Sequence, residues 1–240
     1  MRSVRRRSGA RSFQGDDGLW SNCPAGGDST MHITRRHLVA GAAAVAGVSA
    51  VKAQSLKVTS AQDLGPFYPI VRPADHDADL TRLKGSREVA IGQPIQVIGR
   101  IVDVGGQPIS GATVDLWQAN AVGRYDHPGD RANPAALDAH FQGFARLSSD
   151  QDGEFRFRSI KPAAYDTPIG TRTPHIHFAI DGLTERLVTQ MYFPGEALNS
   201  SDPILNRAEH RAGLIAEAID RLSADPQALA FRWTIVLVSG

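Results

Sequence analysis

The sequence predicts a mainly β protein, with an antiparallel β-sandwich core, an extended N-terminal arm and a short helix before the last strand. Two observations carry this prediction. Short segments rich in β-branched and apolar residues recur with turn residues between them, and one stretch alone has helical periodicity. The 240 residues, 42% hydrophobic and 21% charged, are enough to bury the core of one domain of moderate size.

The expected strands follow one another along the second half of the chain. They cover 95–104, 112–118, 143–149, 154–160, 175–181, 186–193 and 230–237. Two glycine-containing stretches, Gly105-Gly106 and Asp150-Gln151-Asp152-Gly153, are hairpin-type turns between such segments. The helix is expected near 207–222, where apolar residues recur at helical spacing: Ala212, Leu214, Ile215, Ala218, Ile219 and Leu222.

An arm at 54–90 is expected to precede the sandwich, which occupies 91–240. The arm is polar and irregular and contains the stretch Leu64-Gly65-Pro66-Phe67-Tyr68-Pro69. Two prolines and a glycine exclude a helix there. An extended conformation follows.

Residues 31–53 have the order of a twin-arginine export signal. Thr34-Arg35-Arg36-His37-Leu38 precedes a stretch rich in Ala, Gly and Val, which ends in the small-x-small tripeptide Val51-Lys52-Ala53. We therefore expect a periplasmic or secreted protein. The alternative is a buried apolar helix beside an arginine pair.

The first 30 residues are rich in Arg, Gly, Ser and Asp and have no apolar periodicity. Such a composition is typical of a disordered extension. Met31 is the first residue of the export signal, so 1–30 are interpreted as disordered or as upstream of the true start. The sequence leaves Met1 and Met31 open as the first residue.

The charge and cysteine content of the mature part exclude several classes of protein. Beyond residue 53 there are 18 basic and 22 acidic residues, a net charge of −4, which does not favour nucleic acid as a partner. The single cysteine, Cys23, lies before the signal, so the mature part has neither a disulfide nor a thiolate metal site. The longest apolar run, Leu38 to Val51, is too short to span a bilayer, so no membrane association is expected in the mature form.

Two histidines on one predicted strand are candidate metal ligands. In His175-Ile176-His177 the imidazoles are two residues apart, and alternate residues of a strand share a face, so both can bind one ion. A chance pairing in a strand is the alternative.

The tyrosines add a second kind of ligand. Two of the four tyrosines in the chain, Tyr125 and Tyr165, lie in irregular stretches with proline or glycine. A phenol with a reference pKa near 10 binds a metal as phenolate only when a strongly Lewis-acidic ion displaces its proton. Hard anionic oxygen suits iron(III). The alternative is a pair of half-buried loop tyrosines that hydrogen-bond to the backbone.

Several ordered motifs surround these residues. They are Gly111-Ala-Thr-Val-Asp-Leu-Trp-Gln-Ala-Asn-Ala121 with Gly-Arg-Tyr125, Asp152-Gly-x-Phe-x-Phe-Arg158 with Lys161-Pro-x-x-Tyr165, Arg172-Thr-Pro-His-Ile-His-Phe178, and Gln190-Met-Tyr-Phe193. In this order they resemble the intradiol ring-cleavage dioxygenases, and most of all the β-chain-like members of the protocatechuate 3,4-dioxygenase branch. The resemblance covers roughly Leu64 to Gly195 and the closing strand, so that 91–240 resembles the catalytic sandwich of that family.

The resemblance implies one mononuclear, non-haem iron(III) with four protein ligands: Tyr125, Tyr165, His175 and His177. Arg172 matches the family's arginine that stabilises negative charge on the bound substrate, and Gln190 matches a glutamine of the pocket. Without the resemblance, both would be ordinary surface or strand polar residues. Tyr68 lies in the stretch that resembles the pocket-lining arm; it is a candidate substrate contact, with a purely structural role as the alternative.

The implied activity is that of an oxidoreductase that opens a catechol-type ring between its hydroxylated carbons with O2, giving a muconate-type diacid. Two phenolates, two neutral imidazoles and one hydroxide balance the charge of a ferric ion, so the buried centre is neutral. In the family the tyrosine matching Tyr165 leaves when the diol binds. A protocatechuate-like substrate is expected, and Arg124, Arg131 or Lys161 would recognise its carboxylate; hydroxyquinol or a substituted catechol is the alternative.

Two further expectations concern neighbours and partners. His127 and His140 are interpreted as surface or pocket-rim groups rather than ligands. The chain is expected to form a homo-oligomer or to pair with a homologous chain. The rival to an enzyme is a secreted, transthyretin-like β-sandwich binding module in which the same side chains only line a pocket.

Overall fold

The structure is a computed structural model that describes residues 55–238. The expected export signal and the segment before it lie outside the described residues. Within residues 55–238 no helix is long and apolar enough to cross a membrane.

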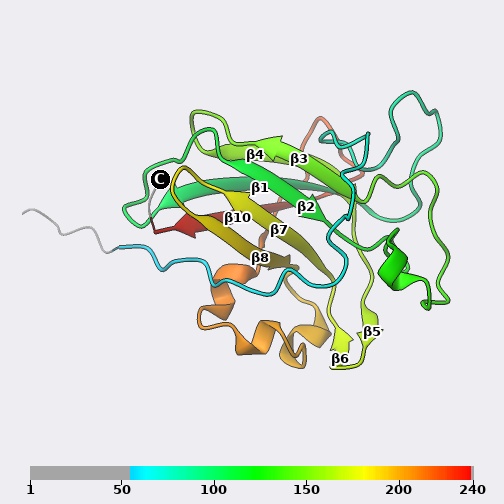
Figure 1. Ribbon diagram of the computed structural model, residues 1–240. Helices are drawn as coiled ribbons and strands as arrows, with labels where there is room; N and C mark the ends of the chain where they lie inside the picture. The colour runs from blue at the N-terminus through cyan, green and yellow to red at the C-terminus, as the bar shows by residue number, and fades with distance from the viewer. Residues whose placement is uncertain (1–54, 239–240) are drawn as a thin grey trace, which may run out of the picture. The chain divides into compact units, whose positions relative to one another are not determined.

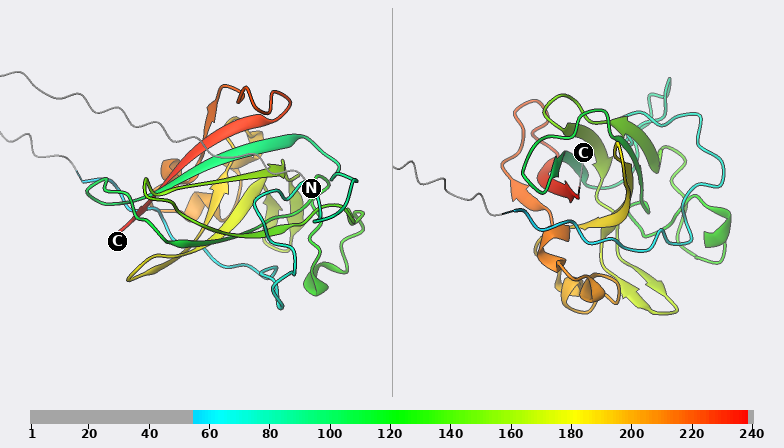
Figure 2. Two further views of the ribbon diagram at one scale, coloured as in Figure 1. Left: turned by 90° about the horizontal axis from the view of Figure 1, so that it is seen from above. Right: turned by 60° about the vertical axis from the view of Figure 1, so that its left-hand side comes forward.

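Two four-stranded sheets form the body of the protein (Figures 1 and 2). The first has the order β4 (Glu154–Ile160), β1 (Pro94–Asp103), β10 (Leu229–Leu237) and β9 (Glu217–Ile219). The second has the order β3 (Phe144–Ser148), β2 (Thr113–Trp117), β7 (His175–Asp181) and β8 (Arg186–Tyr192). Neighbouring strands are antiparallel except β1 and β10, which run parallel. The predicted mainly β sandwich is confirmed, and the seven predicted strands match β1 to β4, β7, β8 and β10 within one or two residues.

Aromatic side chains from both sheets meet in the core. Phe178 of β7 packs against Phe155 and Phe157 of β4, at centroid distances of 6.2 and 6.1 Å, and against Trp233 of β10 at 5.0 Å. Each of these residues is at most 3% exposed. Burial of one such side chain contributes on the order of 1.5–3 kcal/mol, so this cluster holds the sheets together.

The strand β7 is buried on both faces. Ile176, Phe178 and Ile180 belong to the core between the sheets, whereas His175 and His177 alternate with them on the opposite face and are 1% and 2% exposed. Because both histidines are buried, other segments must pack over the outer face of the second sheet. The two candidate histidines therefore lie between this sheet and the segments that cover it.

The N-terminal arm runs along this side of the molecule without regular secondary structure, as predicted (Figure 1, blue to cyan). The backbone N–H of Thr59 donates to the carbonyl of Val236, and that of Gln62 donates to the carbonyl of Val188. Farther along, Phe67 and Tyr68 pack against the cluster around Trp117. The arm is thus tied to strands of both sheets before it reaches the site.

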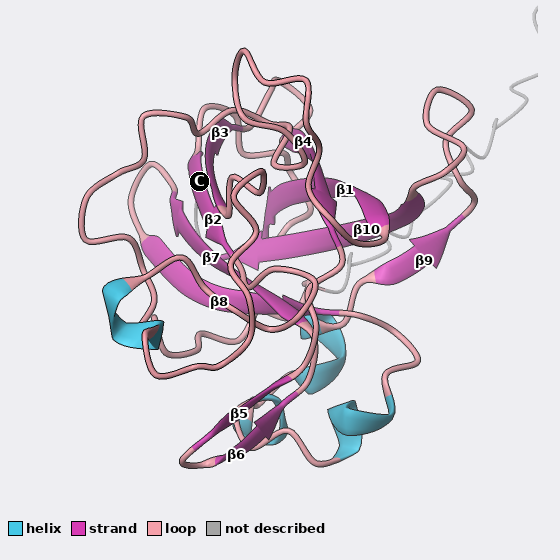
Figure 3. Cartoon of the chain, turned by 90° about the vertical axis from the view of Figure 1, so that its right-hand side faces the viewer, coloured by secondary structure: helices cyan, strands magenta, loops and turns pink. Residues whose placement is uncertain are grey.

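A two-stranded ribbon of β5 (Tyr165–Thr167) and β6 (Gly170–Arg172) extends beyond the two sheets and was not predicted (Figure 3). Short 3-10 helices occupy the connections: η1 (Pro128–Asp130), η2 (Ala197–Ser200), η3 (Leu205–Arg207) and η4 (Arg211–Leu214). The ribbon ends close to the first histidine of β7, because only Thr173 and Pro174 separate β6 from β7.

The predicted helix near 207–222 is wrong. The end of η3, all of η4 and the strand β9 occupy this range. In an α-helix each backbone N–H would donate to the carbonyl four residues earlier, but here backbone groups bond to residues of the two sheets. The N–H of Ala216 donates to the carbonyl of Tyr192, and the carbonyl of Gly213 accepts from the Trp233 indole. These hydrogen bonds to the sheets stabilise the segment more than a short helix would, and a glycine within the segment lowers its helix propensity further.

The turn at 150–153 also differs from the prediction. It is tight, with the N–H of Gly153 donating to the carbonyl of Asp150, but the strands that it joins, β3 and β4, belong to different sheets. It is therefore a link between the sheets and not a hairpin. The turn at Gly105-Gly106 does connect paired backbone, because Val102 forms an antiparallel bridge with Pro108.

Candidate active site

The strand β7 presents His175 and His177 side by side on the outer face of the second sheet. Their Nε2 atoms are 3.2 Å apart. The His177 ring stacks on Trp117 of the neighbouring strand β2, at 5.0 Å and 13° between the planes, so its orientation is fixed by packing. The two imidazoles therefore lie close together on one face of the strand, and whether they share a metal ion stays a prediction.

Loop contacts bring Tyr125 to the histidines. The Asp130 carboxylate accepts from the backbone N–H of Tyr125 at 2.8 Å, and the Tyr125 ring stacks on Phe67 of the arm at 4.4 Å. Gly123 has a φ of +79°, and a Cβ at this residue would lie 2.7 Å from the carbonyl oxygen of Ala164. Glycine is needed here because it allows the two tyrosine-bearing loops to touch.

The other tyrosine, Tyr165, opens the ribbon strand β5 and pairs with Arg172 of β6. Its hydroxyl oxygen lies 3.4 Å from that of Tyr125 and 3.3 Å from Nε2 of His175. Four potential donor atoms from three separate parts of the chain thus form a continuous cluster, in which neighbouring atoms are 3.2–3.4 Å apart.

Burial sets the protonation of this cluster. It lowers the pKa of His175 to about 3, an effect to which the charge of Arg172 adds and which the carbonyl of Thr173 opposes, and it lowers the pKa of His177 well below the usual value. Burial likewise raises the pKa of Tyr165, and it raises that of Tyr125 well above the usual value with a contribution from the Tyr165 phenol. Both imidazoles are therefore neutral, and both phenols hold their protons unless a strong Lewis acid replaces them.

These donors fit a metal ion. Nδ1 of His175 lies 2.6 Å from the carbonyl of Thr173, so this nitrogen carries the proton and Nε2 offers a lone pair to the cluster. Among residues 55–238 no group of three or more His, Cys, Asp or Glu side chains could hold a metal, so a site here depends on the phenols. Two phenolic oxygens with two imidazole nitrogens are a donor set that suits a hard trivalent ion such as iron(III).

The cluster borders a cavity of about 860 Å³. Its wall includes side chains of the cluster and of the predicted pocket, namely Tyr165, Arg172, His177 and Gln190, and the arm residues Gly65, Pro66 and Phe67. A volume in this range is ample for a small aromatic ligand. Of the predicted site residues, Tyr125, His175 and Tyr68 do not line this cavity; Tyr125 and His175 reach it only through their contacts with Tyr165 and His177.

The structure places Tyr68 away from this cavity. Its hydroxyl donates to Oδ2 of Asp115 at 2.8 Å, and its ring packs edge-on against Trp117. Asp115 is in turn paired with Arg146. Phe67, the preceding residue, lines the cavity instead. Nothing in the local sequence pattern distinguishes the two aromatic residues, so the sequence alone does not predict this role of Phe67.

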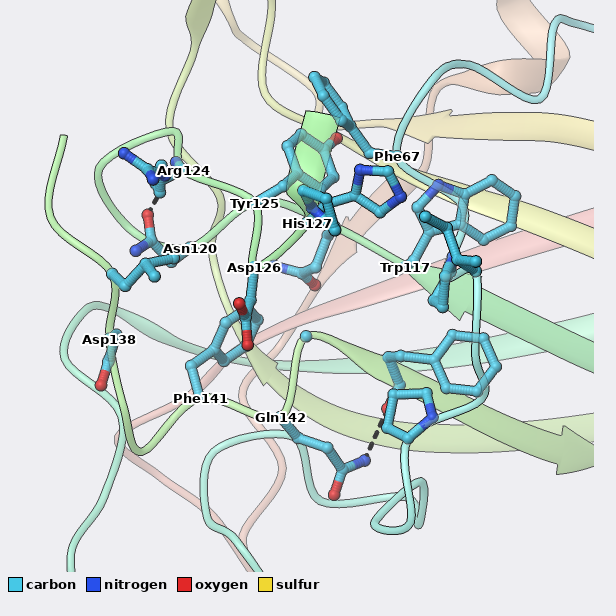
Figure 4. A pocket seen from close by; sticks show the side chains of 18 of the residues that line it. Phe67, Trp117, Asn120, Arg124, Tyr125, Asp126, His127, Asp138, Phe141 and Gln142 are labelled. Atoms are coloured by element: carbon cyan, nitrogen blue, oxygen red, sulfur yellow. Dashed lines mark hydrogen bonds between the residues drawn. The ribbon is translucent and has the colours of Figure 1, made fainter. Parts of the chain in front are cut away.

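His127 and His140 make no contact with the four-donor cluster. Nδ1 of His127 accepts from the backbone N–H of Gly129, and this ring lines a second cavity of about 440 Å³ that shares Phe67 with the first. Figure 4 shows His127 there with Trp117 and Tyr125. His127 thus lies at the wall of the second cavity, whereas His140 is partly exposed and lines neither cavity.

Comparisons with known proteins place this architecture in a class. The family model described as Dioxygenase matches residues 64–239. The protocatechuate 3,4-dioxygenase beta chain of Burkholderia cepacia is 40% identical over 193 residues, 77% of each chain. The 6-chlorohydroxyquinol 1,2-dioxygenase of Cupriavidus pinatubonensis is 35% identical over 58% of this chain, which spans about half (52%) of that relative.

A solved structure gives the same result. The dioxygenase domain of a dioxygenase and carbohydrate-binding fusion from Streptomyces sp. SirexAA-E superposes with a TM-score of 0.58 at 25% identity, over 77% of this chain and all of that one. Fold and sequence together define a dioxygenase of the β-sandwich type. More specifically, the chain belongs to the intradiol ring-cleavage dioxygenase family and is an enzyme, not the non-catalytic binding module considered as its rival.

Proposed function

We propose that Tyr125, Tyr165, His175 and His177 hold one non-haem ferric ion, and that the enzyme cleaves a catechol-type ring between its hydroxylated carbons with O2 in the adjoining cavity. One observation carries this proposal: four donor atoms of the required kinds form one cluster, and two of the donor residues, Tyr165 and His177, line a cavity large enough for an aromatic diol. A bound ferric ion would supply the Lewis acidity that keeps the phenols ionised and withdraws electron density from a catecholate.

The two tyrosines are suited to different tasks. Tyr125 is 3% exposed and its ring stacks on Phe67, whereas Tyr165 is only partly buried and lines the cavity. Tyr165 is therefore the phenol that can swing away and accept a proton at its hydroxyl oxygen when a diol enters. Tyr125 stays in place.

Arg172 supplies the positive charge. Burial lowers its pKa, but the neighbouring oxygens of Tyr192 and Asp202 raise it by more, so the guanidinium stays charged. In a water-poor cavity a fixed cation stabilises negative charge that develops on the ring. Gln190 accepts from Nη2 of Arg172 at 2.6 Å and so orients it.

Three measurements on the purified protein test this function. We expect about one iron per chain by metal analysis, a visible charge-transfer band from tyrosinate bound to ferric ion, and oxygen uptake with catechols but not with monophenols. Colourless, iron-free protein that binds catechols without oxygen uptake would contradict the proposal.

We further propose a protocatechuate-like substrate, supported by the 40% identity to a protocatechuate 3,4-dioxygenase beta chain. Recognition of a carboxylate calls for a cation. Of the three candidates, Arg124 binds backbone carbonyls and lies 3.8 Å from Asp130, and Lys161 is paired with Glu196. Arg131 is exposed and stands between two residues that line the cavity, so it is the candidate that we favour.

A comparison of two substrates tests this assignment. Arg131→Gln should raise KM for protocatechuate by about tenfold, since a charge-assisted hydrogen bond contributes about 1.5–3 kcal/mol, and should leave KM for unsubstituted catechol unchanged. An equal change for both substrates would argue against a carboxylate contact.

Assembly and export are also proposals. A relative that is named as a beta chain supports association with a homologous chain or with a second copy, which native mass spectrometry would reveal. Export by the twin-arginine route is tested by changing Arg35 and Arg36 to Lys, which should leave the protein in the cytoplasm. Unchanged export would contradict the signal.

A further inference from the structure

The guanidinium of Arg172 is held on one edge by groups from two segments, the strand β8 and the loop that contains Asp202. Its Nε donates to Oδ2 of Asp202 at 2.9 Å, and its Nη2 donates to Oε1 of Gln190 at 2.6 Å and to the hydroxyl of Tyr192 at 3.2 Å. That hydroxyl also contacts Oε1 of Gln62 in the arm at 3.0 Å. The residue as a whole is 3% exposed.

The remaining nitrogen of Arg172, Nη1, has no hydrogen-bond partner among the described residues. Arg172 lines the cavity. The bonds on Nε and Nη2 therefore leave Nη1 as the donor that faces a ligand.

Asp202 is the anionic member of this arrangement and is 0% exposed. Its Oδ2 accepts from Arg172 and from the backbone N–H of Thr173 at 2.9 Å. Its Oδ1 accepts from the backbone N–H groups of Ile204 and Leu205 at 2.9 and 2.8 Å. Three backbone donors fix the carboxylate rigidly, so its position is set before the arginine binds to it.

We propose that Asp202 is a positioning residue for the reaction: it holds the Arg172 guanidinium in the orientation that directs Nη1 at the substrate. This inference rests on the proposed role of Arg172. A long arginine side chain has many rotamers, and a donor that is misplaced by about 1 Å loses much of its effect in the transition state. The carboxylate selects one rotamer through a buried, charge-assisted bond.

A purely structural role of Asp202 makes a different prediction. Asp202 also binds the N–H of Thr173, whose carbonyl accepts from Nδ1 of His175. If Asp202 served mainly to hold this histidine, its loss would reduce iron content and alter the visible band. If it acts through Arg172, iron and colour persist and turnover falls.

A double-mutant cycle separates the two roles. We expect Asp202→Asn to lower kcat by about 100-fold, with KM within about threefold and with unchanged iron content and visible band. Arg172→Gln should lower kcat by a similar or larger factor. In the Arg172→Gln background, Asp202→Asn should change kcat by less than about twofold, because the group through which Asp202 acts is gone.

The matched control is Asp225→Asn. It breaks the ion pair with Arg158, which lies on β4 of the first sheet and not on the sheet that carries the site, so kcat should be unchanged. Independent, multiplicative effects of Asp202→Asn and Arg172→Gln, or a loss of iron from Asp202→Asn, would overturn the proposal. If the Asn variant does not fold, Asp202→Glu replaces it, and a reduction in kcat that persists in the Arg172→Gln background would overturn the proposal equally.

Failure of the proposed function itself would look different. The wild-type enzyme would then show no oxygen uptake with any catechol, and no cycle could be measured. A wild type that turns over normally while Arg172→Gln has no effect would remove the role of Arg172, and with it the role of Asp202.

Discussion

The two histidines and the two tyrosines of the candidate site are positioned in different ways. His175 and His177 belong to one regular strand, which is buried on both faces, pairs with β8 along its whole length and pairs with β2 from His177 onward. Tyr125 lies in a loop, and Tyr165 opens a three-residue strand outside the two sheets. The histidines are held by the sandwich, whereas the tyrosines are held by contacts between loops.

This difference teaches which part of the site is rigid and which part can move. Strand pairing fixes the histidines through backbone hydrogen bonds that a point mutation elsewhere does not disturb. Tyr165 depends on local contacts and is partly exposed, which suits a ligand that must leave when the substrate enters. On the proposed function, the strand supplies the rigid anchors of the metal and the ribbon supplies the ligand that moves.

The largest expected effect concerns the strand. His177→Ala should remove a buried anchor without a substitute within reach, and we expect iron affinity to fall by more than about 100-fold and oxygen uptake to vanish. His140→Ala is the control, because His140 makes no contact with the cluster and should keep its iron. Metal analysis after dialysis provides the measurement; full iron in His177→Ala would show that the strand does not anchor the metal.

The loop ligand should behave differently. Tyr165→Phe removes one donor that is expected to leave during turnover, so we expect the iron content to stay near that of the wild type while kcat falls by about 10²–10⁴-fold, the range of a lost proton acceptor. The visible band should shift, since one tyrosinate remains. Iron loss equal to that of His177→Ala would remove the distinction between anchor and movable ligand.

The sequence predicted the two regions unequally for the same physical reason. Alternation along a strand is a local signal, so the strands and the His-x-His pair could be located directly. The tyrosines became candidates through their loop setting and the family resemblance, because contacts such as that of Gly123 with Ala164 join distant segments. Asp202 escaped notice for this reason: it lies 30 residues from Arg172, and before Pro203 it has the features of an ordinary turn acid.

A smaller effect should follow from crowding the tyrosine-bearing loops. Gly123→Ala places a Cβ 2.7 Å from the carbonyl of Ala164 at a φ of +79°, so the loops must separate or the backbone must strain, at a cost of about 1–3 kcal/mol. We expect a lower melting temperature and weaker iron binding. Gly111→Ala is the matched control: it has a similar φ of +76° but no atom within 4 Å, so it tests strain alone. Equal iron affinity in the two variants would mean that the loop contact does not position Tyr125.

The smallest effect is expected at Tyr68, the arm tyrosine that the sequence placed near the substrate. Tyr68→Phe removes the hydrogen bond to Asp115, but that carboxylate keeps its pair with Arg146, so stability should fall by only about 0.5–1.5 kcal/mol. The ring remains against Trp117, and neither kcat nor KM should change, since Tyr68 does not line the cavity. Phe67→Leu is the informative counterpart, because Phe67 lines the cavity and stacks on Tyr125 and should therefore alter KM. If Tyr68→Phe raised KM and Phe67→Leu did not, the arm would have to shift by one residue when substrate binds, and the loop side of the site would be more mobile than its packing indicates.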